Sequence, residues 1–314
     1  MNIAPGNIAP GLIGIDIAKQ HLDVFDAALG RAVQIPTTPA AISALIARWP
    51  NKPACVLFEA TGAYDAALRH ALDQDGIRFA RVNPKRARDF ARAAGFLAKT
   101  DAVDAKMLAA MAQCLSPPAE PPAQPERERL ARLHKRRDQL VATRQQERTR
   151  RHDAPAEIAC DITRHIAWLT AEIAALQTRI DQLIAASSTL KQTCRLLRSA
   201  PGVGPVTATT LIALLPELGD RSPQTIAALA GLAPINVESG QFRGKSQIRG
   251  GRKRVRDALY MAALATTRSQ SRFAKLYQAL RTAGKPTKLA LVAVARKLLV
   301  TLNAIVRDNL AFQS

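Results

Sequence analysis

A short stretch in the first third of the chain places two aspartates three residues apart at the predicted start of a helix. Thr100 is a residue type that caps helices, and Asp101 and Asp104 then fall in the first turn. Because residues three apart share one helical face, both carboxylates point the same way and suit a cation. The alternative is that they only complement the positive end of the helix dipole, worth about 0.3–1 kcal/mol each.

Two further acids stand at the ends of predicted strands. Asp16 interrupts an apolar run over residues 12–19, and Glu59 ends a wholly apolar run over residues 54–59. Functional groups of α/β sheets gather at the carboxyl ends of strands, so we expect these two acids to join the helical pair. Four carboxylates can hold two hard divalent cations, with Mg²⁺ or Mn²⁺ favoured by oxygen-only ligation. For each acid taken singly, a turn or capping role is an equal alternative.

A lone serine, Ser239, precedes a strongly basic segment in the last third of the chain. From the residues alone it is one of many serines, because a serine hydroxyl is a weak nucleophile unless it is activated, and no histidine lies nearby in the sequence to support a Ser-His-Asp triad. The basic segment is either a solvated loop or a nucleic-acid contact, and it consists of Arg243, Lys245, Arg249, Arg252, Lys253, Arg254 and Arg256.

The elements that must position the four acids alternate between strands and helices, which predicts a mixed α/β sheet. The continuous apolar run at residues 54–59 belongs in the middle of that sheet. Lys85 and Arg86 begin a predicted helix that follows a strand, where they form either a solvated basic face or a phosphate contact. We expect a short strand within residues 12–19, further strands at residues 21–26, 31–35, 54–59 and 77–82, and helices at 39–49, 64–72 and 84–94.

A proline-rich linker and a helical arm follow this domain. Five prolines among residues 116–125 exclude helix and central strand. We therefore predict domains at residues 1–115, 116–125 (linker), 126–190 (coiled-coil arm) and 191–314. We expect the arm to form a helical hairpin that also dimerises, with an isolated helix packed on its own core as the alternative. Its apolar residues recur every 3.5 positions at Ile162, Ile166, Leu169, Ile173, Leu176, Ile180 and Leu183.

The last domain is predicted to be mainly helical. Gly202 and Gly204 lie in a turn between two helices, and this element resembles a helix-hairpin-helix. Backbone amides in such a turn form a phosphate site, whereas a plain tight turn is the alternative. An amphipathic helix near the end of the chain, over residues 285–303, supplies packing for this domain.

Four blocks in the first 110 residues resemble the DEDD transposases of the insertion sequence 110 family and the related Piv-like DNA invertases. They read Gly-Ile-Asp-Ile-Ala-Lys at residues 14–19, Phe-Glu-Ala-Thr-Gly at 58–62, Val-Asn-Pro-Lys at 82–85 and Lys-Thr-Asp-Ala-Val-Asp-Ala at 99–105. The block at residues 231–263 is similar to the second conserved domain of that family, although Arg252 stands where asparagine is common. The resemblance implies a RuvC-type, ribonuclease-H-like first domain.

The resemblance also implies an activity. It predicts an insertion-sequence transposase that cleaves DNA through a covalent bond to Ser239, with Mg²⁺ or Mn²⁺ on Asp16, Glu59, Asp101 and Asp104. It further implies a synaptic dimer or tetramer, assembled through the coiled coil, and guidance by a structured RNA that pairs with donor and target DNA. One alternative is a junction-resolving nuclease or invertase that uses water and no RNA, and another is a catalytically silent nucleic-acid-binding scaffold.

Composition limits the partners. A net charge of +20 and a pI near 10.7 attract polyanions, above all nucleic acid. No apolar run approaches the length of about 20 residues that spans a bilayer, so we expect no membrane partner and a cytoplasmic, nucleoid-associated bacterial protein. The four cysteines lack the close spacing of zinc sites, and we assign them no role.

Overall fold

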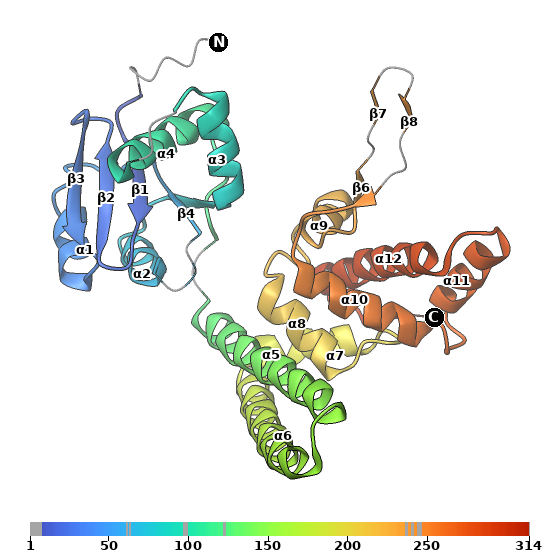
Figure 1. The fold of residues 1–314 in the computed structure, drawn as a ribbon. Helices are drawn as coiled ribbons and strands as arrows, with labels where there is room; N and C mark the ends of the chain where they lie inside the picture. The colour runs from blue at the N-terminus through green and yellow to red at the C-terminus, as the bar shows by residue number, and fades with distance from the viewer. Residues whose placement is uncertain are drawn as a thin grey trace. The chain divides into compact units, whose positions relative to one another are not determined.

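A computed structural model describes residues 8–60, 62, 64–96, 100–121, 124–235 and 247–313, together with the backbone of residues 238–239 and 242–243. The chain divides into two compact units, Met1–Ala123 and Gln124–Ser314. The first unit contains a sheet with helices, and the second is mainly helical (Figure 1).

The first unit is built on a mixed five-stranded sheet with the order β3-β2-β1-β4-β5. β1 pairs with β2 in the antiparallel sense and with β4 in the parallel sense, and β4 pairs in parallel with β5. The strand predicted to be central, β4, has parallel neighbours on both sides, and a ribonuclease-H-like core is compatible with this arrangement. The strands are β1 (Leu12–Ile17), β2 (His21–Asp26), β3 (Arg31–Pro36), β4 (Cys55–Glu59) and β5 (Phe79–Val82).

Helices cover both faces of this sheet. Val56 and Phe58 of β4 pack with α1 (Pro39–Ile46) and α2 (Ala66–Gln74), whereas Cys55 and Leu57 pack on the other face. The partners there are α3 (Pro84–Ala93) and α4 (Asp101–Leu115), and α4 crosses β1 and β2 in Figure 1. Successive strand residues point to opposite faces, so Gly14 and Asp16 of β1 face α4. The predicted strand and helix order of this unit is confirmed.

Gly14 sets the distance between α4 and the sheet. A Cβ atom at this position would lie 1.9 Å from the Ala105 carbonyl oxygen and 2.5 Å from the Ala109 backbone nitrogen. Both neighbours are backbone atoms of a helix, so neither can move away by changing a rotamer. The helix that carries Asp101 and Asp104 therefore reaches Asp16 because position 14 has no side chain.

We predict that Gly14→Ala displaces α4, because the added Cβ meets backbone atoms of that helix. Overpacking of this kind should cost about 1–3 kcal/mol of stability. The measurement is the thermal unfolding midpoint of the variant beside that of the wild type. A wild-type midpoint would contradict this packing.

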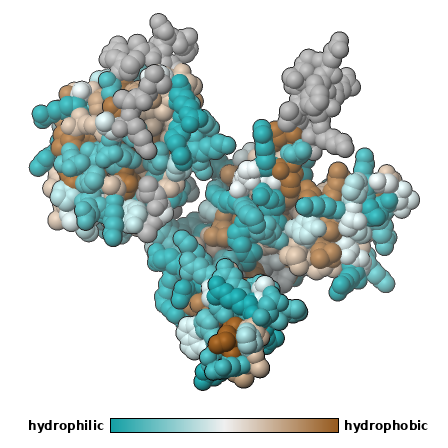
Figure 2. All heavy atoms as spheres, in the orientation of Figure 1, coloured by the Kyte–Doolittle hydropathy of each residue, from teal (hydrophilic) through white to brown (hydrophobic). Residues whose placement is uncertain are grey.

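The second unit begins with a helical hairpin. α5 (Pro125–His152) and α6 (Ala156–Ala186) pack through Leu140, Leu169, Ile173 and Leu176. These are positions of the predicted apolar seam, so a hairpin forms within one chain. In Figure 2 the visible surface of this hairpin is mainly hydrophilic. Supercoiling of the two helices and pairing between subunits remain predictions.

The remaining helices form the core of the second unit. Leu211 of α8, Leu259 of α10 and Leu298 of α12 are fully buried in one apolar cluster. α5 joins this core through His134, whose Nε2 lies 3.1 Å from Thr210 Oγ1, and burial lowers the pKa of this imidazole. The helices are α7 (Ser188–Arg198), α8 (Pro205–Leu214), α9 (Pro223–Leu229), α10 (Lys253–Thr266), α11 (Arg272–Thr282) and α12 (Thr287–Asp308).

Among the described residues, α12 is the one helix that is long and apolar enough to cross a membrane by length and composition, with 22 residues and a mean hydropathy of 1.9 over its most apolar window. Arg296 and Lys297 interrupt its apolar sequence. Half of that window is buried in the core of the unit. A buried core helix passes the same test of length and composition.

Candidate active site

Three of the four predicted acids converge where β1 ends and α4 begins. Thr100 caps α4 as predicted, since its hydroxyl oxygen accepts a hydrogen bond from the Val103 amide at 3.3 Å. The cap places Asp101 and Asp104 in the first turn. One ligand oxygen from each of Asp16, Asp101 and Asp104 lies within 4.8 Å of the others. Three carboxylates from two elements can therefore share one hard cation.

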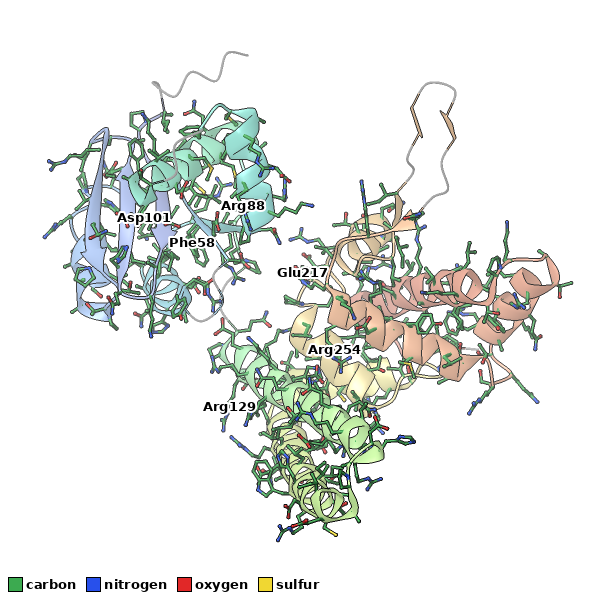
Figure 3. All side chains as sticks on the ribbon, in the orientation of Figure 1. Phe58, Arg88, Asp101, Arg129, Glu217 and Arg254 are labelled. Carbon is green, nitrogen blue, oxygen red and sulfur yellow. The ribbon has the colours of Figure 1, made fainter. Side chains whose placement is uncertain are left out.

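Glu59 lies at the end of β4, next to β1 in the sheet, but outside the groups within 4.8 Å that the described residues form. Burial, followed by the charge of Asp16, raises the pKa of the Glu59 carboxyl, while Arg88 of α3 opposes the shift. Figure 3 shows Arg88 and Asp101 in this unit. The fourth acid is thus electrostatically coupled to Asp16 and Asp104, although it is not in the tightest cluster.

The crowding of acids has a cost when no cation is bound. Burial is the largest cause of the raised pKa of Asp16, and the charges of Asp104 and Asp101 add to it. Like charges disfavour one another's ionised forms, and a bound divalent cation removes that penalty. The donor set, oxygen atoms from carboxylates, fits Mg²⁺ or Mn²⁺.

Sequence reasoning missed two neighbours of the acids, His21 and Asp23 of β2. His21 Nε2 lies 3.5 Å from Asp101 Oδ2 and 3.6 Å from Asp23 Oδ2, and these three residues form a second group of possible ligands. Asp23 is buried and accepts hydrogen bonds from Gln34 at 3.2 Å. The register of the tight β1–β2 hairpin pairs Asp16 with Asp23, so the hairpin pattern alone could have identified this second acid.

The predicted nucleophile lies in the second unit. Ser239 belongs to β7 (Glu238–Ser239), which pairs with β8 (Phe242–Arg243) and places Ser239 opposite Phe242. The backbone is described here, and the side chains of Ser239 and Arg243 lie outside the description. Lys245 lies entirely outside the described residues.

Several of the basic residues that follow have partners within the chain. Arg252 forms two hydrogen bonds with Glu217, at 2.5 and 2.7 Å, and Arg254 forms a similar pair with Asp138 of α5. Arg256 donates to the Gly250 carbonyl at 2.7 Å. Arg249 is exposed, as is Lys253, whose amine lies 2.6 Å from Asp257. Part of this basic segment therefore makes contacts within the fold, and nucleic-acid binding by it stays a prediction.

The other predicted nucleic-acid contacts are at turns and helix starts. Lys85 and Arg86 are exposed in the first turn of α3, whose cap Asn83 accepts a hydrogen bond from the Lys85 amide at 2.9 Å. Gly202 lies in the turn between α7 and α8, and Gly204 immediately precedes α8. The turn predicted between two helices is present, while phosphate binding there stays a prediction.

The sequence is similar to those of known transposases and of a DNA-inverting protein. Residues 194–278 match the Transposase IS116/IS110/IS902 family, and residues 13–160 match a DEDD transposase family of IS110 type. The chain is 31% identical over 264 residues to the pilin gene-inverting protein of Moraxella lacunata, which covers 82% of this chain and 81% of that protein. It is also 32% identical over 121 residues to an uncharacterized protein of insertion element IS110 from Streptomyces coelicolor, covering 38% of this chain and 30% of that protein. The chain therefore belongs to the IS110 family of transposases, and its function class is DNA transposition and recombination.

Proposed function

We propose that the protein is an insertion-sequence transposase that cuts and rejoins DNA through a covalent bond to Ser239. The observation that carries this proposal is the meeting of Asp16, Asp101 and Asp104 within 4.8 Å, in a chain of a DNA-recombining family. Glu59 completes the acidic set through its coupling to Asp16. The four acids hold Mg²⁺ or Mn²⁺, and Ser239 attacks the phosphate.

The proposed reaction conserves the number of phosphate ester bonds. The Ser239 oxygen forms a bond to phosphorus as one bond from phosphorus to a deoxyribose oxygen breaks. The serine proton leaves, and the departing sugar oxygen gains one. A sugar hydroxyl from another strand then reverses the step, releasing the serine and joining new strands. Divalent metal, when bound, neutralises the phosphate charge and favours loss of the serine proton.

This chemistry requires both units to serve one phosphodiester in the active assembly. Because a proline-rich linker and a helical arm separate the acids from Ser239 in the sequence, we propose that a dimer or tetramer, formed through the arm, assembles the site. The domain limits proposed for this assembly are 1–115 for the acidic domain, 116–125 for the linker, 126–190 for the arm and 191–314 for the serine domain.

Nucleic acid is the proposed partner throughout. Double-stranded donor and target DNA bind to Lys85, Arg86, the turn at Gly202 and Gly204, and the basic segment at residues 243–254. We propose that a structured guide RNA selects these DNA sites. Support comes from the net charge of +20 and from membership in the family.

A second candidate function is site-specific DNA inversion without a guide RNA. It is favoured by the 31% identity to two proteins named for pilin gene inversion, from Moraxella lacunata and Moraxella bovis. To separate the RNA-guided transposase from the invertase, the purified protein is given candidate DNA sites with and without RNA transcribed from the flanking DNA, and recombination is measured. Recombination that is independent of RNA would favour the invertase.

The test of the covalent mechanism is to incubate end-labelled DNA with the protein and divalent metal, and then to denature. We expect labelled DNA that stays attached to the protein, and no such product when the metal is chelated. Cleaved DNA with free ends, and no attached protein at any time, would instead support a nuclease that uses water.

A further inference from the structure

The segment that carries Ser239 leaves and re-enters the second unit through a very short stem. Its two strands are β6 (Pro234–Ile235) and β9 (Gln247–Ile248), and they pair Pro234 with Ile248 and Ile235 with Gln247. An isolated pair of strands is at best marginally stable in water, and these have two residues each. Contacts below the stem must therefore hold it to the helices.

Two glycines provide the first of these contacts. A Cβ atom on Gly251 would lie 2.2 Å from the Gly231 backbone nitrogen, and one on Gly231 would lie 2.3 Å from the Gly250 carbonyl oxygen. The outgoing and returning chains thus touch backbone to backbone. Next to this contact, the Arg252 amide donates to the Leu229 carbonyl at 2.8 Å.

Arg256 of α10 joins both sides of the same base. Its Nη1 donates to the Gly250 carbonyl at 2.7 Å and makes a longer contact of 3.5 Å with the Gly231 carbonyl. A Cβ atom on Gly231 would lie 2.1 Å from this nitrogen, so the guanidinium occupies the space that a side chain there would need. One side chain of α10 therefore links the outgoing and the returning chain.

We propose that Arg256 is a positioning residue for the segment bearing Ser239, rather than a contact to nucleic acid. The inference rests on the proposed role of Ser239 as nucleophile. Arg256 fixes the base of the stem to α10, and so orients the segment that presents the serine. Its neighbour Arg252, paired with Glu217, anchors the start of α10 in the same region.

The two roles predict opposite results for Arg256→Gln. If Arg256 contacts a phosphate, the variant should bind DNA more weakly, and the slope of log affinity against log salt should fall by about one. A positioning residue would leave that slope unchanged and would lower the rate of adduct formation at saturating DNA by about 10- to 100-fold. Arg256→Lys keeps the charge, but its terminal nitrogen is one bond short of the position of Nη1, so it should bind DNA like wild type and still react slowly.

Two other variants calibrate these measurements. Lys275→Gln removes one exposed positive charge from α11 of the same unit and serves as the matched control. Arg249→Gln removes an exposed charge beside the stem and should reduce the salt slope. A reduced slope in Arg256→Gln, with a wild-type rate at saturation, would overturn the positioning role.

A readout that does not depend on the reaction separates this inference from the proposed function. Backbone hydrogen exchange in peptides covering residues 231–235 and 247–252 should be faster in Arg256→Gln and Arg256→Lys than in Lys275→Gln. Unchanged exchange would contradict the inference even if Ser239 is the nucleophile. If the wild type forms no covalent adduct, or if Ser239→Ala still forms one, the proposed function is contradicted. The hydrogen-exchange result then still decides whether Arg256 holds the base of the stem.

Discussion

Replacing Ser239 by alanine is expected to abolish the covalent protein–DNA adduct. The substitution removes the only protein oxygen that the proposed reaction joins to phosphorus, and loss of an enzyme nucleophile lowers rates by at least about 10⁴-fold. DNA binding should remain, because the basic residues and their salt-dependent contacts are unchanged. The measurement is the yield of labelled DNA that stays attached to protein after denaturation, at saturating DNA and metal.

Ser188→Ala is the matched control for this substitution. Ser188 is exposed at the start of α7 in the same unit, and its replacement removes the same atom from another surface position. We expect wild-type adduct formation in this variant. An adduct that survives in Ser239→Ala would mean that another residue attacks the DNA.

Replacing Asp104 by asparagine is expected to lower adduct formation by about 10³-fold, because metal stabilisation of the reacting phosphate contributes several kcal/mol. The change keeps the size of the side chain and removes its charge from the cluster with Asp16 and Asp101. Since the charge of Asp104 raises the pKa of Asp16, its loss relieves repulsion in the metal-free protein. The unfolding midpoint in chelator should therefore not fall.

Thermal unfolding with and without Mn²⁺ measures whether Asp104 is needed to bind the metal. A ligand that binds the folded state raises the midpoint, so wild type should be stabilised by metal and Asp104→Asn should not. Asp89→Asn, at an exposed position on α3, is the control and should respond like wild type. If Asp104 only complements the helix dipole, the variant would lose about 0.3–1 kcal/mol and keep its response to metal.

The sequence predicts the order of elements well where local chemistry decides. The Thr100 cap, the first-turn acids of α4 and the proline-rich break after the first domain all depend on residues close together in the chain. The apolar seam of the arm likewise predicts the α5–α6 hairpin. These features need no knowledge of distant contacts.

What the sequence did not reveal depends on distant contacts. The lack of a side chain at Gly14 matters because α4 lies directly above it, about ninety residues later in the chain. The partners of Arg252 and Arg254, Glu217 and Asp138, come from other elements and are invisible to a reading of charge runs. Segments that look like nucleic-acid contacts can therefore also hold the fold together.

The central claim is that metal on the acids and the hydroxyl of Ser239 act on the same phosphodiester. Its most direct test replaces one non-bridging oxygen of the scissile phosphate with sulphur, in each of the two stereoisomers. Mg²⁺ binds sulphur poorly and softer metals bind it better. We predict that one isomer slows adduct formation on Ser239 by about 10- to 100-fold in Mg²⁺, that Mn²⁺ restores the rate, and that Asp104→Asn loses this restoration. Equal rates in both metals for both isomers would contradict the claim, because they would mean that the metal does not touch the phosphate that the serine attacks.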